Sequence, residues 1–239
     1  MIGTLHLVGV GPGDPELLTL KAARILATVP VVAFPSTGTG AALARDIAEA
    51  HLDPAATRLP IAIPMTVERG PAQAAYDAGA EAILAHLRAG RDVAYLCEGD
   101  PLFYGSAMYL LPRITPYATV AVVPGVTSLT AAAATIARPL AARNEILKIL
   151  PAPLPDEVLR AELAAAPAAA IIKVGRHFDR IRALLAVTGH AAGAVVVEHA
   201  TGPGERITRL DDFAHDERPY FSTILCYAGA ESWRPGPES

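Results

Sequence analysis

The chain has 239 residues, of which 52% are hydrophobic and 18% are charged, and its formal net charge is −4. This composition excludes intrinsic disorder and allows one large domain, or two small ones, with a buried core. The negative charge also argues against nucleic acid as a partner, because proteins that bind it usually present a basic surface.

Short runs of β-branched residues alternate along the chain with longer segments rich in alanine and leucine. In chain order we predict a strand at 5–10, a helix at 15–27, a strand at 29–34, a helix at 39–50, a strand at 58–63, a helix at 71–89, a strand at 93–96, a helix at 104–113 and a strand at 119–123. From there we predict a helix at 128–137, a strand at 146–150, a helix at 155–165, a strand at 169–174, a helix at 179–187 and strands at 194–198, 205–210 and 220–227.

This alternation predicts an α/β protein in which helices cover both faces of parallel sheets. The last strands follow one another with little helix between them, so we expect antiparallel strands near the C-terminus. A strand ends near Pro124, where a Gly/Thr/Ser segment opens a new helix. We therefore predict two α/β domains: residues 1–124 with a mostly parallel sheet, and residues 125–239 with a mixed sheet. Ligands should bind in a cleft between them, beyond the carboxyl ends of the strands.

The two cysteines, Cys97 and Cys226, lie inside apolar runs, and no Cys/His spacing indicates a metal site. We interpret them as buried strand residues of a protein from a reducing compartment. The first residues lack the pattern of a signal peptide, and no apolar run is long enough to span a bilayer. We therefore expect a soluble, cytoplasmic protein without a bound metal or a membrane segment.

A glycine-rich loop, GVGPGDP at 9–15, follows the first predicted strand. It fails the dinucleotide fingerprint G-x-G-x-x-G, because Asp14 stands at the third glycine position and would repel a pyrophosphate. Pro12 removes a backbone N–H that could hold phosphate, and no GKS or GKT sequence indicates a P-loop. The loop therefore predicts either a tight turn or a close backbone approach to a ligand other than a phosphate.

Two further strand ends carry polar residues, in EGDP at 98–101 and in VPGVTS at 123–128. Glu98 and Asp100 would place two carboxylates at the carboxyl end of a strand, where they suit a ligand with positive charge and amine donors. Asp100 could instead cap the following helix. Thr127 and Ser128 could likewise cap the next helix, face a ligand, or do both.

Together the three junctions resemble the tetrapyrrole methylase family, whose members are similar to GVGPGDPELLT at 9–19, EGDPLFYG at 98–105 and VPGVTSLTAAAA at 123–134. The order and separation of these motifs also fit, and the resemblance covers nearly the whole chain. Further segments, at 140–151, 172–178, 197–207 and 219–224, resemble the branch of the family that methylates C20 of precorrin-2.

The resemblance implies a homodimer of two-domain subunits that binds S-adenosylmethionine and releases S-adenosylhomocysteine. It also implies a set of cofactor-binding residues at the strand ends: Pro12, Glu98, Gly99, Asp100, Tyr104, Thr127, Ser128, Leu150, Val174 and Ala200. Since the cofactor carries a sulfonium and an ammonium but no phosphate, a loop that cannot hold phosphate is no obstacle.

The implied substrate is a tetrapyrrole with eight carboxylates, which need basic partners. The candidates are Arg143, Arg176 and His177. A proton must leave after methylation, and Asp100, Glu198 or water could accept it. No acid–base pair stands out, and none is required, because positioning alone can contribute up to ~7–11 kcal/mol to such a displacement.

Three alternatives stay open at this point. One is a sister enzyme of the same family that methylates another position, as the uroporphyrinogen-III methyltransferases do. The others are a nucleotide-dependent oxidoreductase, which the failed glycine fingerprint disfavours, and a module that only binds the cofactor. Whether the substrate contains cobalt is also left open.

Overall fold

The computed structural model describes residues 1–37, 41–64, 69–214 and 221–228. The first residues of the predicted helix 39–50 and of the predicted strand 220–227 lie outside these ranges. The chain divides into two compact units, Met1–Thr127 and Ser128–Ser239. Each unit contains one sheet with helices, which confirms the predicted two-domain α/β fold. The predicted cleft between the domains stays a prediction.

The first unit is built on a parallel sheet with the strand order β3-β2-β4-β1-β5. Its strands are β1 (Leu5–Gly9), β2 (Val31–Ser36), β3 (Thr57–Ala62), β4 (Val93–Cys97) and β5 (Val120–Val123). β1 lies between β4 and β5, with Gly9 opposite Cys97 and Val8 opposite Val123. The carboxyl ends of these three strands, from which the three motif loops start, are therefore neighbours at one edge of the sheet.

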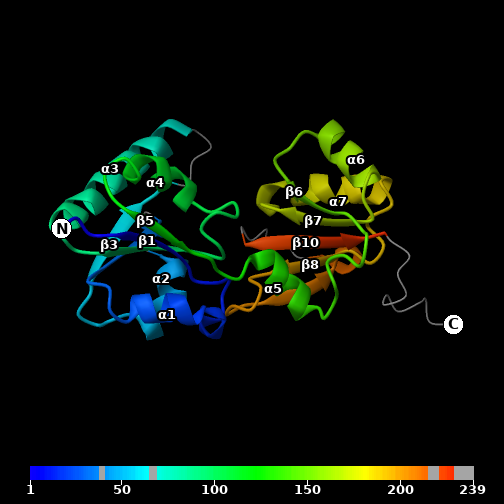
Figure 1. Cartoon of the computed structure of the whole chain (residues 1–239). Helices are drawn as coiled ribbons and strands as arrows, with labels where there is room; N and C mark the ends of the chain where they lie inside the picture. Colours follow the sequence, from blue (N-terminus) through cyan, green and yellow to red (C-terminus); the bar gives the residue numbers. More distant parts are fainter. Residues whose placement is uncertain (38–40, 65–68, 215–220, 229–239) are drawn as a thin grey trace. The chain divides into compact units, whose positions relative to one another are not determined.

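Helices cover both faces of this sheet (Figure 1). The short helices α1 (Leu20–Leu26) and α2 (Leu43–Ala48) lie on one face, and α3 (Arg69–Arg88) and α4 (Ala107–Ile114) lie on the other. Each face has its own apolar core, which explains why β4 is buried along its whole length.

The predicted helix 15–27 is divided into a 3-10 turn η1 (Pro15–Leu17) and α1. Leu18 and Thr19 between them have extended backbone, and the Thr19 hydroxyl accepts a hydrogen bond from the Ala22 N–H at 3.1 Å. Thr19 thus caps α1, so the helix begins later than the spacing of apolar residues suggests.

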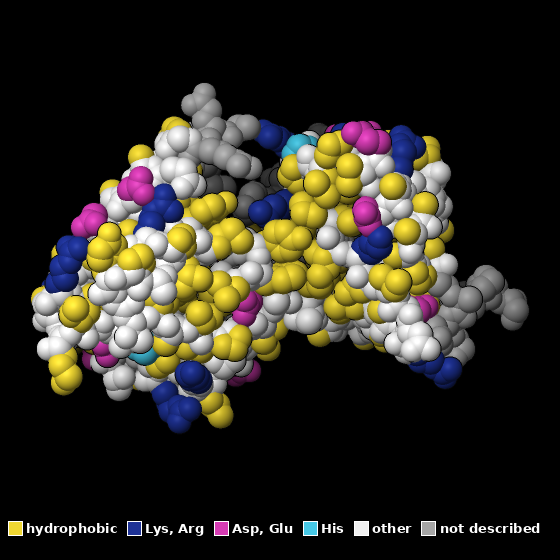
Figure 2. Space-filling view, turned by 45° about the horizontal axis from the view of Figure 1, so that its top comes forward, with side chains coloured by type: hydrophobic (Ala, Val, Ile, Leu, Met, Phe, Trp, Pro, Cys, Tyr) yellow, Lys and Arg dark blue, Asp and Glu magenta, His cyan; other side chains and the backbone are white. Residues whose placement is uncertain are grey.

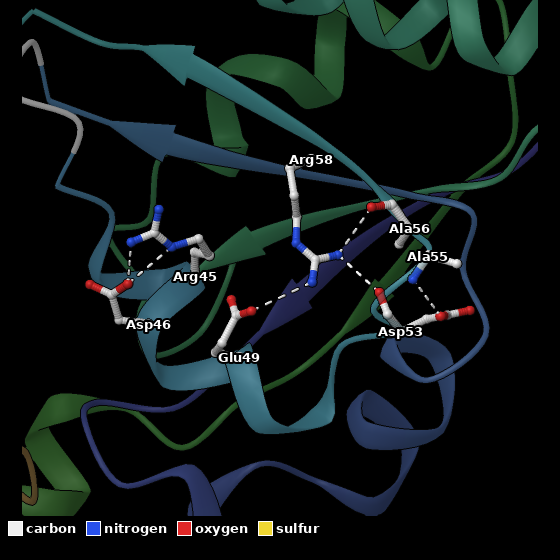
Figure 3. A network of polar contacts seen from close by, with 7 residues as sticks. All are labelled: Arg45, Asp46, Glu49, Asp53, Ala55, Ala56 and Arg58. Atoms are coloured by element: carbon white, nitrogen blue, oxygen red, sulfur yellow. Dashed lines mark hydrogen bonds and ion pairs between the residues drawn. The ribbon is translucent and has the colours of Figure 1, made fainter.

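A polar network holds the connection from α2, through the 3-10 turn η2 (Glu49–His51), to β3 (Figure 3). The Arg58 guanidinium lies 3.6 Å from the Glu49 carboxylate and donates to the carbonyl oxygens of Asp53 at 3.1 Å and Ala56 at 3.3 Å. Because Glu49 is exposed, the ion pair itself contributes at most ~1 kcal/mol. The carbonyl contacts fix the turn that feeds β3.

The second unit has a mixed sheet with the order β6-β7-β10-β8-β9. Its strands are β6 (Leu147–Pro151), β7 (Ala168–Ile172), β8 (Val195–Glu198), β9 (Arg206–Arg209) and β10 (Ser222–Tyr227). β6 and β7 are parallel, whereas β10 is antiparallel to both β7 and β8, and β9 is antiparallel to β8. The predicted change to antiparallel strands near the C-terminus is confirmed.

In this unit α6 (Asp156–Ala164) and α7 (Phe178–Val187) cover one face of the sheet, and α5 (Ser128–Thr135) covers the other (Figure 1). The α6/α7 face holds a large apolar core in which Phe178 stacks on Phe213 at 4.1 Å between ring centroids. The buried residues of α5 are Leu129 and three alanines, so this face removes less apolar surface from water.

On the face shown in Figure 2, Lys/Arg and Asp/Glu side chains are interspersed among broad hydrophobic areas. Among the described residues of that face (Figure 2), the Lys and Arg side chains stand apart rather than in one continuous area. Among the helices that the structure describes, none is long and apolar enough to cross a membrane.

Candidate functional site

The loops after β1 and β4 are joined through their backbones. The Gly11 N–H donates to the Gly99 carbonyl at 3.3 Å, and the Gly99 N–H donates to the Gly11 carbonyl at 2.8 Å. Gly11 takes a positive φ of 80°, which glycine adopts without strain. The first two motifs are therefore one structural unit at the edge of the sheet.

Glycine at positions 9 and 125 is required because three backbone segments meet there. A Cβ on Gly125 would lie 2.2 Å from the Gly99 carbonyl oxygen. A Cβ on Gly9 would lie 2.6 Å from the same oxygen and 2.7 Å from the Gly125 nitrogen. The close backbone approach that the glycine loop predicts thus takes place between the motif loops themselves, which the sequence does not indicate.

Asp100 ties two of these loops together. Its Oδ1 accepts hydrogen bonds from the Leu102 N–H at 2.9 Å and the Phe103 N–H at 3.1 Å, and its Oδ2 accepts one from the Gly125 N–H at 3.0 Å. The alternative that Asp100 caps the following helix is therefore wrong: Asp100 caps a turn within its own loop, whereas α4 begins at Ala107 with Ser106 as its N-cap. The bond to Gly125 adds a positioning role that reaches the third motif.

Glu98 is partly buried at the end of β4, and burial raises the pKa of its carboxyl group. Hydrogen bonds from its own backbone and from the backbone of Ala44 lower that pKa in part. Ala44 lies in the first turn of α2, whose N-cap Ala42 has no side-chain capping bond. The Glu98 carboxylate therefore accepts a hydrogen bond from the backbone at the start of α2. Neither the motif nor the spacing of apolar residues predicts this contact.

The remaining predicted residues around the first sheet lie near the same edge. Pro12 is half-buried in the first loop, and Tyr104 is 42% exposed with a positive φ of 55°. Thr127 is the last residue of the first unit, and Ser128 is the exposed first residue of α5.

In the second unit, Leu150, Val174 and Ala200 lie at or just beyond the carboxyl ends of β6, β7 and β8. All three are buried, and Leu150 and Val174 belong to the apolar core. Any contact of these two residues with a ligand would therefore involve the backbone.

Glu198, the last residue of β8, is only 2% exposed, and its carboxylate lies 3.7 Å from the Arg206 guanidinium on β9. It is therefore a buried carboxylate with a cationic neighbour.

The structure separates the three basic residues predicted to bind substrate. Arg176 and His177 lie in the 3-10 turn η3 (Gly175–His177), just after the carboxyl end of β7. Arg143 precedes β6 and lines a shallow hollow of about 520 Å³ together with Pro167, which directly precedes β7. The two groups are at opposite ends of a strand of five residues, a separation of roughly 17 Å.

The donor atoms at the edge of the first sheet suit a cationic ligand. The motif segments 9–15, 98–106 and 123–128 contain carboxylates, hydroxyls and carbonyls but no Lys, Arg or His. Within the described residues, no group of three or more His, Cys, Asp or Glu could hold a metal ion. This chemistry fits a sulfonium and an ammonium better than a phosphate.

Residues 4–213 match the family described as Tetrapyrrole (Corrin/Porphyrin) Methylases. The chain is 39% identical to a precorrin-2 C(20)-methyltransferase of Sinorhizobium sp., with 99% of this chain and 98% of that protein covered. It is 33% identical to the cobalt-precorrin-2 C(20)-methyltransferase of Salmonella typhimurium, with 94% and 96% covered. It is also 42% identical to the cobalamin biosynthesis protein CobIJ of Mycobacterium bovis, but it spans only 46% of that longer protein.

Solved structures show the same architecture. A uroporphyrin-III C-methyltransferase from Thermus thermophilus, complexed with S-adenosylhomocysteine, is similar with a TM-score of 0.67 and 30% identity, covering 93% of this chain and 97% of that one. The cobalt precorrin-4 methyltransferase CbiF has a TM-score of 0.72 at 24% identity, with 94% of each chain covered, and thus shares the fold.

Proposed function

The chain belongs to the tetrapyrrole methylases, and on that premise we propose that it transfers the methyl group of S-adenosylmethionine to C20 of precorrin-2. The observation that carries this proposal is the match, over nearly the full length of both partners, to two enzymes named for C20 methylation. This function is favoured over a sister activity at another position, and an oxidoreductase is not supported.

The proposed cofactor site is formed by the strand-end loops. When bound, the cofactor supplies the electrophilic methyl group and leaves as S-adenosylhomocysteine. Pro12, Gly99 and Tyr104 would line it in the first unit, with Thr127 and Ser128 beside them. From the second unit, the backbone near Leu150, Val174 and Ala200 would contribute. The role of the protein is to hold a carbon nucleophile in line with the methyl group.

The two carboxylates named as proton acceptors differ in their surroundings. The Asp100 carboxylate already accepts hydrogen bonds from three backbone N–H groups, so we assign it to positioning of the loops rather than to proton transfer. That leaves Glu198, or water, as the proposed acceptor of the proton that leaves after methylation. Glu98 is proposed as a cofactor-side carboxylate, since it lies next to Gly99 and is partly exposed.

A turnover assay tests the proposal. Purified protein is incubated with S-adenosylmethionine and either metal-free precorrin-2 or its cobalt complex, and the products are analysed by mass spectrometry and NMR. We expect one added methyl group at C20 and stoichiometric formation of S-adenosylhomocysteine. Failure with both substrates, or methylation at another carbon, contradicts the proposal. Comparison of the two rates identifies the metal state of the substrate.

We also propose a cytoplasmic homodimer. Two buried, free cysteines are in keeping with a reducing compartment. Exposed apolar side chains in one segment, Leu102, Met108 and Tyr109, support a contact with a second copy. Light scattering after size exclusion should give twice the chain mass, and a monomer at micromolar concentration would contradict the dimer.

A further inference from the structure

Three strands of the second sheet, β7, β8 and β9, bring basic residues to one edge. His199 follows β8, and its N–H donates to the Phe221 carbonyl, just before β10, at 2.9 Å. Glu198 is in register with Ser222 on one side and with Arg206 of β9 on the other. Lys173 follows β7, which pairs with the other side of β10. We call Lys173, Arg176, His177, His199 and Arg206 the basic edge.

The backbone at this edge takes an unusual conformation. Lys173, His199 and Thr201 have positive φ angles of 58°, 47° and 62°, which side-chain-bearing residues rarely adopt. Glu205 braces the loop, because its carboxylate accepts from the Thr201 N–H at 2.5 Å and from the Thr135 hydroxyl of α5 at 3.1 Å. Conformations of this kind persist only where the surrounding structure holds them, as Glu205 does here.

Three of the described acidic groups near this edge have identified partners. Glu198 faces Arg206 at 3.7 Å, Glu205 holds the loop, and Asp156 is paired with Arg180. Lys173 and Arg176 are both exposed. Burial lowers the pKa of His177, and the charges of Arg180 and Arg176 lower it further. A chain of net negative charge thus concentrates positive charge here.

We propose that the basic edge binds carboxylate groups of the tetrapyrrole, with Lys173 and Arg176 as the main contacts and His199 beside them. This inference rests on the proposed function, because it names the subsite that the substrate of that reaction would use. From β7 to β9 the edge extends across three strand spacings, about 14 Å, so it suits several carboxylates around one ring rather than a single anion. The proposal places Arg143, at the opposite edge, outside the subsite.

The test is a fluorescence titration of the full-length protein with uroporphyrin III, a porphyrin with eight carboxylates, in the presence of S-adenosylhomocysteine. The double variant Lys173→Gln/Arg176→Gln should raise Kd at least tenfold and reduce the salt dependence of binding. The control is Arg160→Gln, an exposed arginine on α6, which should change Kd less than twofold. Arg143→Gln tests the rival edge and should also have little effect. Thermal melts confirm that the variants fold.

Unchanged binding by the double variant, a larger effect of Arg143→Gln, or no binding of the porphyrin by the unaltered protein would each overturn the inference. The proposed function is judged separately by C20 methylation of precorrin-2. If methylation occurs while the double variant binds normally, only the subsite is wrong. If C20 methylation fails while the double variant weakens binding, the subsite stands and the proposed function is wrong.

Discussion

At the scale of single residues, Gly125 offers the sharpest test of how the motif loops pack. We expect Gly125→Ala to destabilise the protein by about 1–3 kcal/mol, because its Cβ would lie 2.2 Å from the Gly99 carbonyl oxygen and would force the loops apart. Affinity for S-adenosylmethionine should fall with it. Urea unfolding and calorimetric titration measure the two effects. The control is Gly70→Ala on α3, where a Cβ meets no atom of the described residues within 4 Å. Equal stability of the two variants would refute the packing argument.

Asp100 allows a related prediction with a different cause. In Asp100→Asn, Oδ1 can still accept from Leu102 and Phe103, but an NH₂ group replaces the acceptor for the Gly125 N–H. An unsatisfied donor costs ~1–3 kcal/mol, so stability and cofactor affinity should both fall. Asp53→Asn keeps its single bond to the Ala55 N–H and should be nearly neutral. A rate loss with unchanged stability and cofactor affinity would instead indicate proton transfer by Asp100.

Glu98 predicts a dependence of stability on pH. Burial raises the pKa of its carboxyl group above the ordinary value of 4.5, so the folded state holds this proton more tightly than the unfolded state. Its contribution to stability is therefore lost as pH rises from the ordinary pKa through the raised one. The Glu98→Gln variant lacks this loss, so its melting temperature should increase relative to that of the unaltered chain as the pH rises above the ordinary pKa of 4.5. Parallel curves for the two proteins would contradict the assignment.

At the scale of elements, the start of α1 depends on one hydroxyl. We expect Thr19→Ala to cost about 0.5–2 kcal/mol, because the Ala22 N–H loses its capping acceptor. Thr28→Ala, just beyond the other end of the same helix, should cost less, since its hydroxyl only donates to carbonyls at 3.3 and 3.4 Å. Thr19→Ser should restore most of the loss. Chemical denaturation compares the variants, and similar losses for both alanine variants would rule out the cap.

The succession of elements could be predicted from the sequence because strands and helices have different apolar spacings, which are local properties. Their ends were harder to place: the predicted strand 169–174 stops at Ile172, since Lys173 turns to a φ of 58°. The contact between Glu98 and Ala44, and the meeting of Gly9, Gly99 and Gly125, depend on residues far apart in the chain. Such contacts follow from the strand order, which no periodicity specifies.

At the scale of the whole molecule, each sheet contains one buried cysteine that can report on its own unit. Cys97 lies on β4 and Cys226 on β10, and both thiols are free. Burial raises the pKa of Cys97, and it raises the pKa of Cys226 to about 12 against the opposing charge of Arg138. Because alkylation requires an exposed thiolate, neither cysteine should react while its sheet is intact.

The two sheets differ in how they are covered, and this predicts the order in which the thiols become reactive. Both faces of the first sheet carry an extended apolar core, whereas one face of the second is covered by the short, alanine-rich α5. Less apolar burial gives less stability, so Cys226 should be labelled at lower urea than Cys97. Brief pulses of iodoacetamide at increasing urea, followed by peptide mass spectrometry, give the labelled fraction of each. Coincident curves would mean that the two units unfold together. Labelling of Cys97 at lower urea than Cys226 would mean that the first unit is the less stable one, in spite of its apolar core on both faces.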